Sequence, residues 1–151
     1  MQNYFASNSL IQKLFVIPSI LFVFGCATIS SFDQQAYMQS TSIKVDALNM
    51  MDSATGRYQL QQAQVMQVMT AVNKAYAYEK NRPKNTITVK MWSLLKDTTG
   101  HLLGGFIKRW QREGSLDTTF IRDAKVLVEQ SFDQIAQLES GKIKSSQINN
   151  Q

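Results

Sequence analysis

The sequence predicts an all-α fold, a small helical bundle built on a long antiparallel helical hairpin. Apolar residues recur at intervals of three and four along most of the chain, which is the period of an α-helix. Strand-like alternation of apolar and polar residues is rare, and the 151 residues include only two prolines. A chain with one cysteine cannot form an internal disulfide, so an apolar core must hold this fold together.

Residues 1–25 are predicted to be a signal peptide that is removed from the mature protein. Lys13 supplies a positive charge ahead of an apolar run of 12 residues, 14–25, interrupted only by Pro18 and Ser19, and the segment contains no acid. The run is shorter than the ~20 residues that a helix needs to span a bilayer. Its length is typical of the apolar region of a signal peptide, so the segment is excluded from the fold prediction.

The end of this apolar run resembles the lipobox of bacterial lipoproteins, with the sequence Val23-Phe24-Gly25-Cys26. A lipobox has an aliphatic residue three positions before an invariant Cys and a small residue directly before it; Phe24 departs from the small residue usual at its position. The resemblance implies cleavage before Cys26, diacylation of its sulfur and acylation of its new amine. Two or more acyl chains hold a protein stably at a membrane. Ordinary secretory cleavage after Ala27 is the alternative, because residues 25–27 also fit the small-x-small pattern.

Residue 27 bears on where such a lipoprotein would reside. In enteric-type lipoproteins, an Asp directly after the lipidated Cys retains the protein at the inner membrane, whereas this chain has Ala27. The resemblance therefore implies a protein of the bacterial cell envelope, anchored at the outer membrane through acyl chains such as palmitate on Cys26 and facing the periplasm.

The net charge of the mature chain limits the kinds of binding partner that we expect. Removing residues 1–25 leaves 126 residues, enough for one domain, and lowers the net charge from +5 to +4 through the loss of Lys13. A mildly basic surface suits anionic lipid headgroups, lipopolysaccharide or peptidoglycan carboxylates. No basic run is dense enough for nucleic-acid binding. We therefore expect an envelope protein or cell-wall partner and no nucleic acid.

The helical domain is predicted to cover residues 33–140, and its first half is predicted to form the hairpin. Residues 26–32 are the lipidated cysteine and its spacer. One helix begins near Asp33, and a second extends from 57 to about 81, where the following Arg82-Pro83 ends it. Between them Gly56 predicts either a kink or a short break, because glycine costs about 1 kcal/mol in a helix interior.

Short aromatic-rich helices are expected to lie between the long ones and to close one end of the bundle. We expect helices over 87–96 and 102–113, separated by a turn at 97–100, with Asn85-Thr86 as the candidate cap of the first. A last long helix covers 117–140, capped at its start by Ser115 or Asp117. Gly141 stops this helix, and 141–151 form a disordered polar tail.

The helix over 102–113 is the candidate binding surface, since its apolar residues share one broad face and its cations lie off that face. Binding to a partner or a membrane would use Leu102, Phe106, Ile107, Lys108, Arg109, Trp110 and Arg112. The simpler interpretation, which we favour, is that the apolar face closes the bundle. The resulting core cluster would comprise Tyr76, Trp92, Phe106 and Trp110.

Two further features have mainly structural interpretations. The pair Gly104-Gly105 predicts a close backbone approach or a bend, with a hinge as the functional alternative. His101, the sole histidine, has no Cys, His or paired carboxylate at ligand spacing and is expected at a helix start or in a turn. No serine lies in a Gly-x-Ser-x-Gly or Ser-x-x-Lys motif. We expect a non-catalytic protein without a metal or cofactor.

The leading hypothesis is a lipid-anchored envelope protein that acts as a binding or structural module and presents a helical surface to an envelope partner. Two alternatives remain open. One is an accessory or immunity-like factor of a secretion or membrane machine. The other is a small-molecule carrier with a pocket near Trp92 and Trp110.

Overall fold

The computed structural model describes residues 32–141. Its elements are α1 (Gln34–Asp52), the 3-10 turn η1 (Ser53–Thr55), α2 (Tyr58–Lys80), α3 (Thr86–Lys96), α4 (Leu103–Glu113) and α5 (Thr118–Glu139). This part of the chain contains no strand, which confirms the all-α helical bundle. The predicted signal peptide, Cys26 and nearly all of the predicted tail lie outside the described residues.

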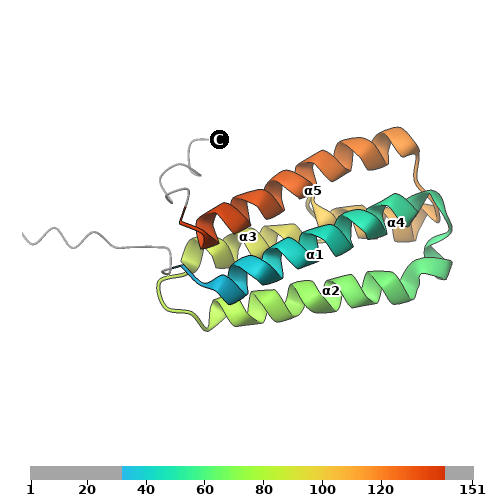
Figure 1. Ribbon diagram of the computed structural model, residues 1–151. Helices are drawn as coiled ribbons and strands as arrows, with labels where there is room; N and C mark the ends of the chain where they lie inside the picture. The colour runs from blue at the N-terminus through green and yellow to red at the C-terminus, as the bar shows by residue number, and fades with distance from the viewer. Residues whose placement is uncertain (1–31, 142–151) are drawn as a thin grey trace, which may run out of the picture.

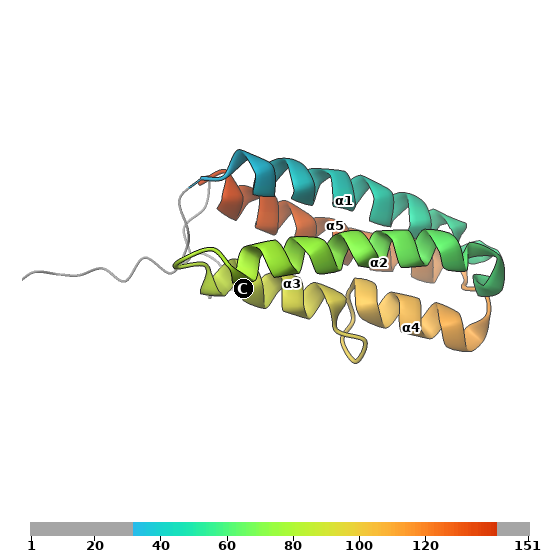
Figure 2. The ribbon, with the colours of Figure 1, turned by 90° about the horizontal axis from the view of Figure 1, so that it is seen from below.

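The helices form an antiparallel bundle with four legs, which are α1, α2, the pair α3 and α4, and α5 (Figure 1). Helix α1 packs against α2 and α5, while α3 packs against the same two helices from the other side. Helices α3 and α4 follow one another along the third leg, as Figure 2 shows, so the short helices extend the bundle and do not close one end. Helix α1 begins and α5 ends at the same end, which we call the N-terminal end.

The junction of α1 and α2 is a break and not a kink. After η1, Gly56 adopts an extended conformation with φ −86° and ψ 172°. The backbone there is tied to the α4–α5 loop, since Leu116 N donates to Ala54 O at 2.8 Å and Tyr58 N donates to Gly114 O at 2.7 Å. These bonds hold together the two loops at the end opposite the N-terminal end.

The core is apolar and continuous along the bundle. Trp92 meets Phe132 edge to face, with ring centroids 5.8 Å apart, and Trp110 meets Tyr58 in the same way at 5.4 Å. The indole N–H of Trp110 donates to Gly56 O at 3.0 Å. The predicted aromatic cluster is confirmed: Trp92, Phe106 and Trp110 are buried in one core, with Tyr76 packed against it.

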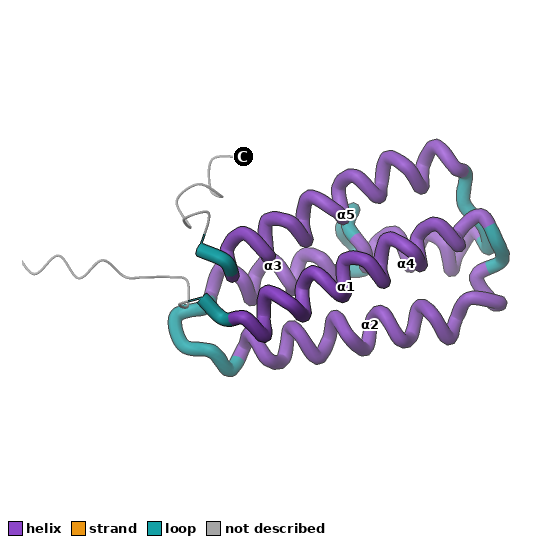
Figure 3. Tube along the Cα trace, viewed as in Figure 1, coloured by secondary structure: helices purple, strands orange, loops and turns teal. Residues whose placement is uncertain are grey.

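The third leg is interrupted at residues 97–102, the loop between α3 and α4 in Figure 3. Asp97 Oδ1 accepts hydrogen bonds from the N–H and the hydroxyl of Thr99, both at 2.8 Å, which fixes a tight turn. A Cβ on Gly104 would overlap the Lys96 carbonyl, and one on Gly105 would overlap the Gly100 carbonyl. The glycine pair therefore permits the close backbone approach that the sequence predicted.

Aspartates cap the first and the last helix of this fold, α1 and α5. Asp33 Oδ1 accepts from Ala36 N at 3.1 Å at the start of α1. Asp117 Oδ1 accepts from Thr119 N at 2.8 Å, which assigns the cap of α5 to Asp117. Asn85 was a possible cap for α3, but its side chain makes no capping bond and points into a buried polar cluster.

Candidate functional site

A groove of about 510 Å³ lies at the seam between α4 and α5. Its α4 wall is Gly105, Phe106, Lys108, Arg109 and Arg112; its α5 wall is Phe120, Asp123, Ala124 and Leu127; the α3–α4 loop adds Thr98, Thr99, Gly100 and His101. We call this feature the α4–α5 groove. Its volume is within the range of about 300–1,000 Å³ that small-molecule clefts occupy.

Aromatic side chains form the apolar floor of the groove. The rings of Phe106 and Phe120 stack with their centroids 5.9 Å apart and their planes 5° from parallel. The guanidinium carbon of Arg109 lies 3.9 Å from the centroid of the Phe120 ring, a cation–π contact. These contacts join α4 to α5 across the seam and leave the groove beside them.

Cations dominate the rim. Glu113 engages two of them, with Arg112 Nη2 at 2.8 Å and Arg109 Nε at 3.1 Å, and these two arginines hold the pKa of the Glu113 carboxyl below its usual range. On the α5 wall, Asp123 pairs with Arg122 at 3.1 Å. Lys108 is exposed and forms no ion pair within residues 32–141. It is therefore the rim cation most available to a ligand.

The predicted binding surface divides into buried and exposed parts. Phe106 is 2% exposed and Trp110 is 0% exposed, so the apolar face of α4 closes the bundle, as we favoured. Leu102 and Ile107 are half-buried against the same core. The cations Lys108, Arg109 and Arg112 line the α4–α5 groove together with Phe106.

The structure also places two other residues that the sequence analysis singled out, His101 and Trp92. His101 is exposed in the α3–α4 loop, in the turn expected for it, and lines the groove. Trp92 is 1% exposed and packed in the core, and neither Trp92 nor Trp110 lines the groove. The groove lies outside this aromatic core, and Phe106 is the member of the cluster that reaches it.

A second polar site lies inside the N-terminal end of the bundle. Arg82 Nη1 donates to Glu139 Oε2 at 2.5 Å and to Glu79 Oε2 at 2.7 Å, and Asn85 Nδ2 donates to the same Glu79 oxygen. We call these four residues the Arg82 cluster. Glu79 and Glu139 are 2% and 1% exposed. The cluster joins the end of α2, the α2–α3 loop and the end of α5.

Burial and the neighbouring charges shift the pKa values of Glu79 and Arg82 in this cluster. Removal from water raises the pKa of the Glu79 carboxyl, and the negative charge of Glu139 raises it further, against the opposing effect of Arg82. Burial alone would lower the pKa of Arg82, but its hydrogen bonds to Glu139 and Glu79 outweigh that effect and raise it. The protonated form of Glu79 is thus favoured relative to an exposed glutamate.

The cluster extends to the first residue of the helical domain. Arg82 Nε lies 3.5 Å from Asp33 Oδ2, which also accepts a hydrogen bond from the Tyr78 hydroxyl at 2.7 Å. This bond lowers the pKa of Asp33, and the Ala36 N–H lowers it further. The same bond raises the pKa of Tyr78. The start of α1 is thereby fixed to the end of α2.

Sequence reasoning missed the Arg82 cluster, although the sequence contains a signal for it. Glu79 continues the buried series of Val65 and Val72 at intervals of seven, and Glu139 continues the series of Phe132 and Ile135. A charged residue at a core position of an amphipathic helix requires a buried partner.

Within residues 32–141, no three His, Cys, Asp or Glu side chains are placed to hold a metal ion. No helix in this described range has both the length and the apolar character needed to cross a membrane. Comparisons of the chain with known protein families, curated proteins and solved structures find no match.

Proposed function

We propose that this chain is a lipid-anchored protein of the bacterial cell envelope whose helical bundle is a non-catalytic binding module. Anchoring rests on the lipobox resemblance that ends at Cys26. The spacer before α1 is short: α1 begins at Gln34, eight residues after Cys26. A chain of eight residues spans at most ~28 Å, so the N-terminal end would be held near the membrane surface.

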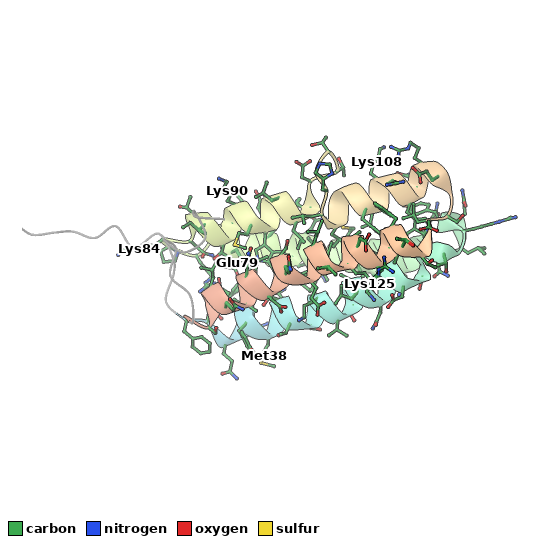
Figure 4. All side chains as sticks on the ribbon, turned by 90° about the horizontal axis from the view of Figure 1, so that it is seen from above. Met38, Glu79, Lys84, Lys90, Lys108 and Lys125 are labelled. Carbon is green, nitrogen blue, oxygen red and sulfur yellow. The ribbon has the colours of Figure 1, made fainter. Side chains whose placement is uncertain are left out.

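The observation that carries the binding role is the α4–α5 groove, which combines an apolar floor with a cationic rim. It lies in the half of the bundle away from the N-terminal end; in Figure 4, Lys108 is near one end and Lys84, in the α2–α3 loop, near the other. A helix of 19 residues such as α1 is ~28 Å long. An anchored bundle could therefore offer the groove to a partner at a distance from the lipid.

The Arg82 cluster supports the same proposal from the other end. Arg82 pairs with Asp33, which lies close in sequence to the proposed anchor at Cys26. The same Arg82 pairs with Glu79 of α2 and Glu139 of α5. A pull on the anchor would be transmitted to the whole bundle and not to one frayed helix. This arrangement suits a domain that must remain folded beside a membrane.

Labelling with a radioactive or clickable palmitate tests the anchor. The full-length chain should be labelled and sediment with membranes, while Cys26→Ala should lose both the label and the sedimentation. Ala27→Asp is the matched control, because it keeps the acylated cysteine and, by the enteric rule, should remain labelled but move to the inner membrane. An unlabelled wild-type chain would overturn the anchoring proposal.

The binding role is tested by cross-linking the full-length protein in intact envelopes. Lys108→Glu reverses a charge on the groove rim, and Lys90→Glu makes the same change at an exposed lysine on α3 (Figure 4). A partner that is lost with Lys108→Glu and retained with Lys90→Glu would support the groove as the binding surface. Equal recovery with both variants would contradict that role.

A small-molecule carrier is the second candidate, and the volume of the groove favours it. An open cleft of about 510 Å³ with aromatic walls matches the size and lining of ligand sites. In this form of the proposal the ligand lies outside the packed cluster of Trp92 and Trp110, against Phe106.

A further inference from the structure

We infer that the α4–α5 groove binds a single-chain anionic amphiphile of the fatty-acid type, with its chain on the aromatic floor and its headgroup at Lys108. The inference deepens the carrier form of the proposed function and rests on it. Three properties of the groove lead to it: an elongated apolar floor, an unpaired cation on the rim, and a size that suits a small ligand.

The floor is elongated along α5. Phe120, Ala124 and Leu127 are successive members of one helical face and extend over ~10 Å of the helix. Leu127 is 48% exposed, so a large apolar side chain remains at the edge of the groove without cover. A strip of this shape fits an extended hydrocarbon chain better than a compact polar molecule, because burial of apolar area drives such binding.

The charge of the rim selects the headgroup. Three cations, Lys108, Arg109 and Arg112, line the groove against one acid, Asp123, which pairs with Arg122. Glu113 at the end of α4 engages both rim arginines. Lys108 is left to supply a charge-assisted hydrogen bond to a carboxylate, while its methylene stem can cover the chain. A cationic headgroup would meet repulsion at the same place.

The groove is too small to form a whole stable protein interface by itself, so a protein partner would also have to contact the surface around it. Stable protein interfaces bury about 800 Å² on each side. Helix α4 has only 11 residues and is ~16 Å long, and its exposed contribution to the groove is confined to one side of that length. A docked acidic helix from another protein is the competing occupant, and a cross-linked protein that depends on Lys108 would reveal it.

Fluorescence titration of the full-length chain tests the inference. The protein is reconstituted in nanodiscs of zwitterionic phosphatidylcholine, which has no net charge, with empty nanodiscs as the blank for partition of the probe into lipid. The probe is 11-(dansylamino)undecanoic acid, excited by energy transfer from tryptophan. Trp110 contacts Phe106 at a centroid distance of 6.4 Å, so a probe in the groove lies close to an indole. We expect saturable transfer that dodecanoate displaces and dodecyltrimethylammonium does not.

Matched variants locate the bound probe. Lys108→Glu should weaken binding at least tenfold, whereas Lys90→Glu should leave it unchanged. Leu127→Asp should weaken binding as well, whereas Leu94→Asp, at a leucine of α3 that is 50% exposed and outside the groove, should not. Because both leucines are half-exposed, neither change should unfold the bundle, and helical circular dichroism of each variant verifies this.

Each result decides between distinct conclusions. Displacement by the cationic amphiphile as strong as by dodecanoate, or no effect of Lys108→Glu, would overturn the inference. Dodecanol that competes as well as dodecanoate would leave an apolar ligand site but refute the choice of an anion. No probe binding at all, with a cross-linked protein that depends on Lys108, would overturn the inference and the carrier form while the binding-module proposal stands. Palmitate labelling judges the anchor independently of all these results.

Discussion

Arg82 and Glu139 are 57 positions apart in the sequence, yet their side chains form an ion pair of 2.5 Å inside the N-terminal end of the bundle. The same Arg82 nitrogen lies 2.7 Å from Glu79 Oε2. Two carboxylates that are almost completely buried thus share one guanidinium. Their solvation has been replaced by a few charge-assisted hydrogen bonds, so the end of the bundle depends on Arg82 more than on any surface charge.

Replacement of Arg82 should therefore be severely destabilising. Arg82→Met keeps much of the side-chain volume but leaves Glu79 and Glu139 facing one another without a cation. Breaking a buried ion pair on one side costs about 3–5 kcal/mol. Urea unfolding of the full-length variant, followed by circular dichroism at the helical band, should show a loss of free energy of unfolding in that range.

The control for this change is Arg122→Met. Arg122 pairs with Asp123 at the surface, and both side chains are mostly exposed. Such a pair contributes little, and the free energy of unfolding should change by no more than about 0.5 kcal/mol. Equal stabilities of the Arg82 and Arg122 variants would show that the Arg82 cluster does not hold the end of the bundle.

The raised pKa of Glu79 predicts how stability depends on pH. In the folded state Glu79 keeps its proton to a higher pH than it does in the unfolded chain. Between the pKa of Glu79 in the unfolded chain and its higher pKa in the folded state, the folded state binds more protons than the unfolded chain. The contribution of Glu79 to stability therefore falls as pH rises through that window. Glu79→Gln retains an oxygen acceptor for Arg82 and Asn85 but cannot ionise, and should remove this fall.

The measurement is the free energy of unfolding from urea titrations at a series of pH values that begins near the reference glutamate pKa of about 4.3 and increases from there. The difference between wild type and Glu79→Gln isolates Glu79 from the other carboxyls. Glu129→Gln is the control, since Glu129 is half exposed and reaches Lys44 only at 3.9 Å. A Glu79→Gln profile parallel to that of the wild type would contradict the prediction.

Local patterns were enough to predict the helices. The period of apolar residues and the stop at Gly141 each depend on a few neighbouring residues, and the structure confirms them. Two choices that the sequence left open are decided by the structure: the interruption at Gly56 is a break, and the cap of α5 is Asp117 and not Ser115. The pair Gly104-Gly105 was likewise identifiable, because two adjacent glycines near a helix start suggest a close backbone approach.

The sites could not be predicted in the same way, because they depend on which helices become neighbours. The groove exists only where Phe120 of α5 meets Phe106 of α4, and periodicity does not specify that pairing. Asn85 illustrates the same limit. Its position before α3 suggested a cap, but the approach of Glu79 offers its amide a buried carboxylate acceptor, and this tertiary contact replaces the local one.

The glycine pair gives a further prediction. Gly104→Ala should be destabilised by about 1–3 kcal/mol, because its Cβ would overlap the Lys96 carbonyl and force the two backbones apart. Gly105→Ala should behave in the same way against the Gly100 carbonyl. Gly100→Ala is the control, since its Cβ would meet Asp97 O at 3.6 Å, an ordinary contact. Thermal unfolding should place the control near the wild type; stable Gly104 and Gly105 variants would refute the close approach.

The final prediction separates two roles of Asp33. Its Oδ1 caps α1 through Ala36 N, and its Oδ2 accepts from Tyr78 and lies near Arg82. Asp33→Ala removes both roles and should cost at least about 1 kcal/mol for the cap alone. Asp33→Asn keeps a good cap but removes the charge, so it should retain more stability than Asp33→Ala. It should also lower the pKa of Tyr78, measured by NMR of ¹³C-labelled tyrosine, since the carboxylate of Asp33 is the main cause that raises it. If both variants lose equal stability and the Tyr78 pKa does not move, the interaction of Asp33 with Tyr78 is not formed in solution.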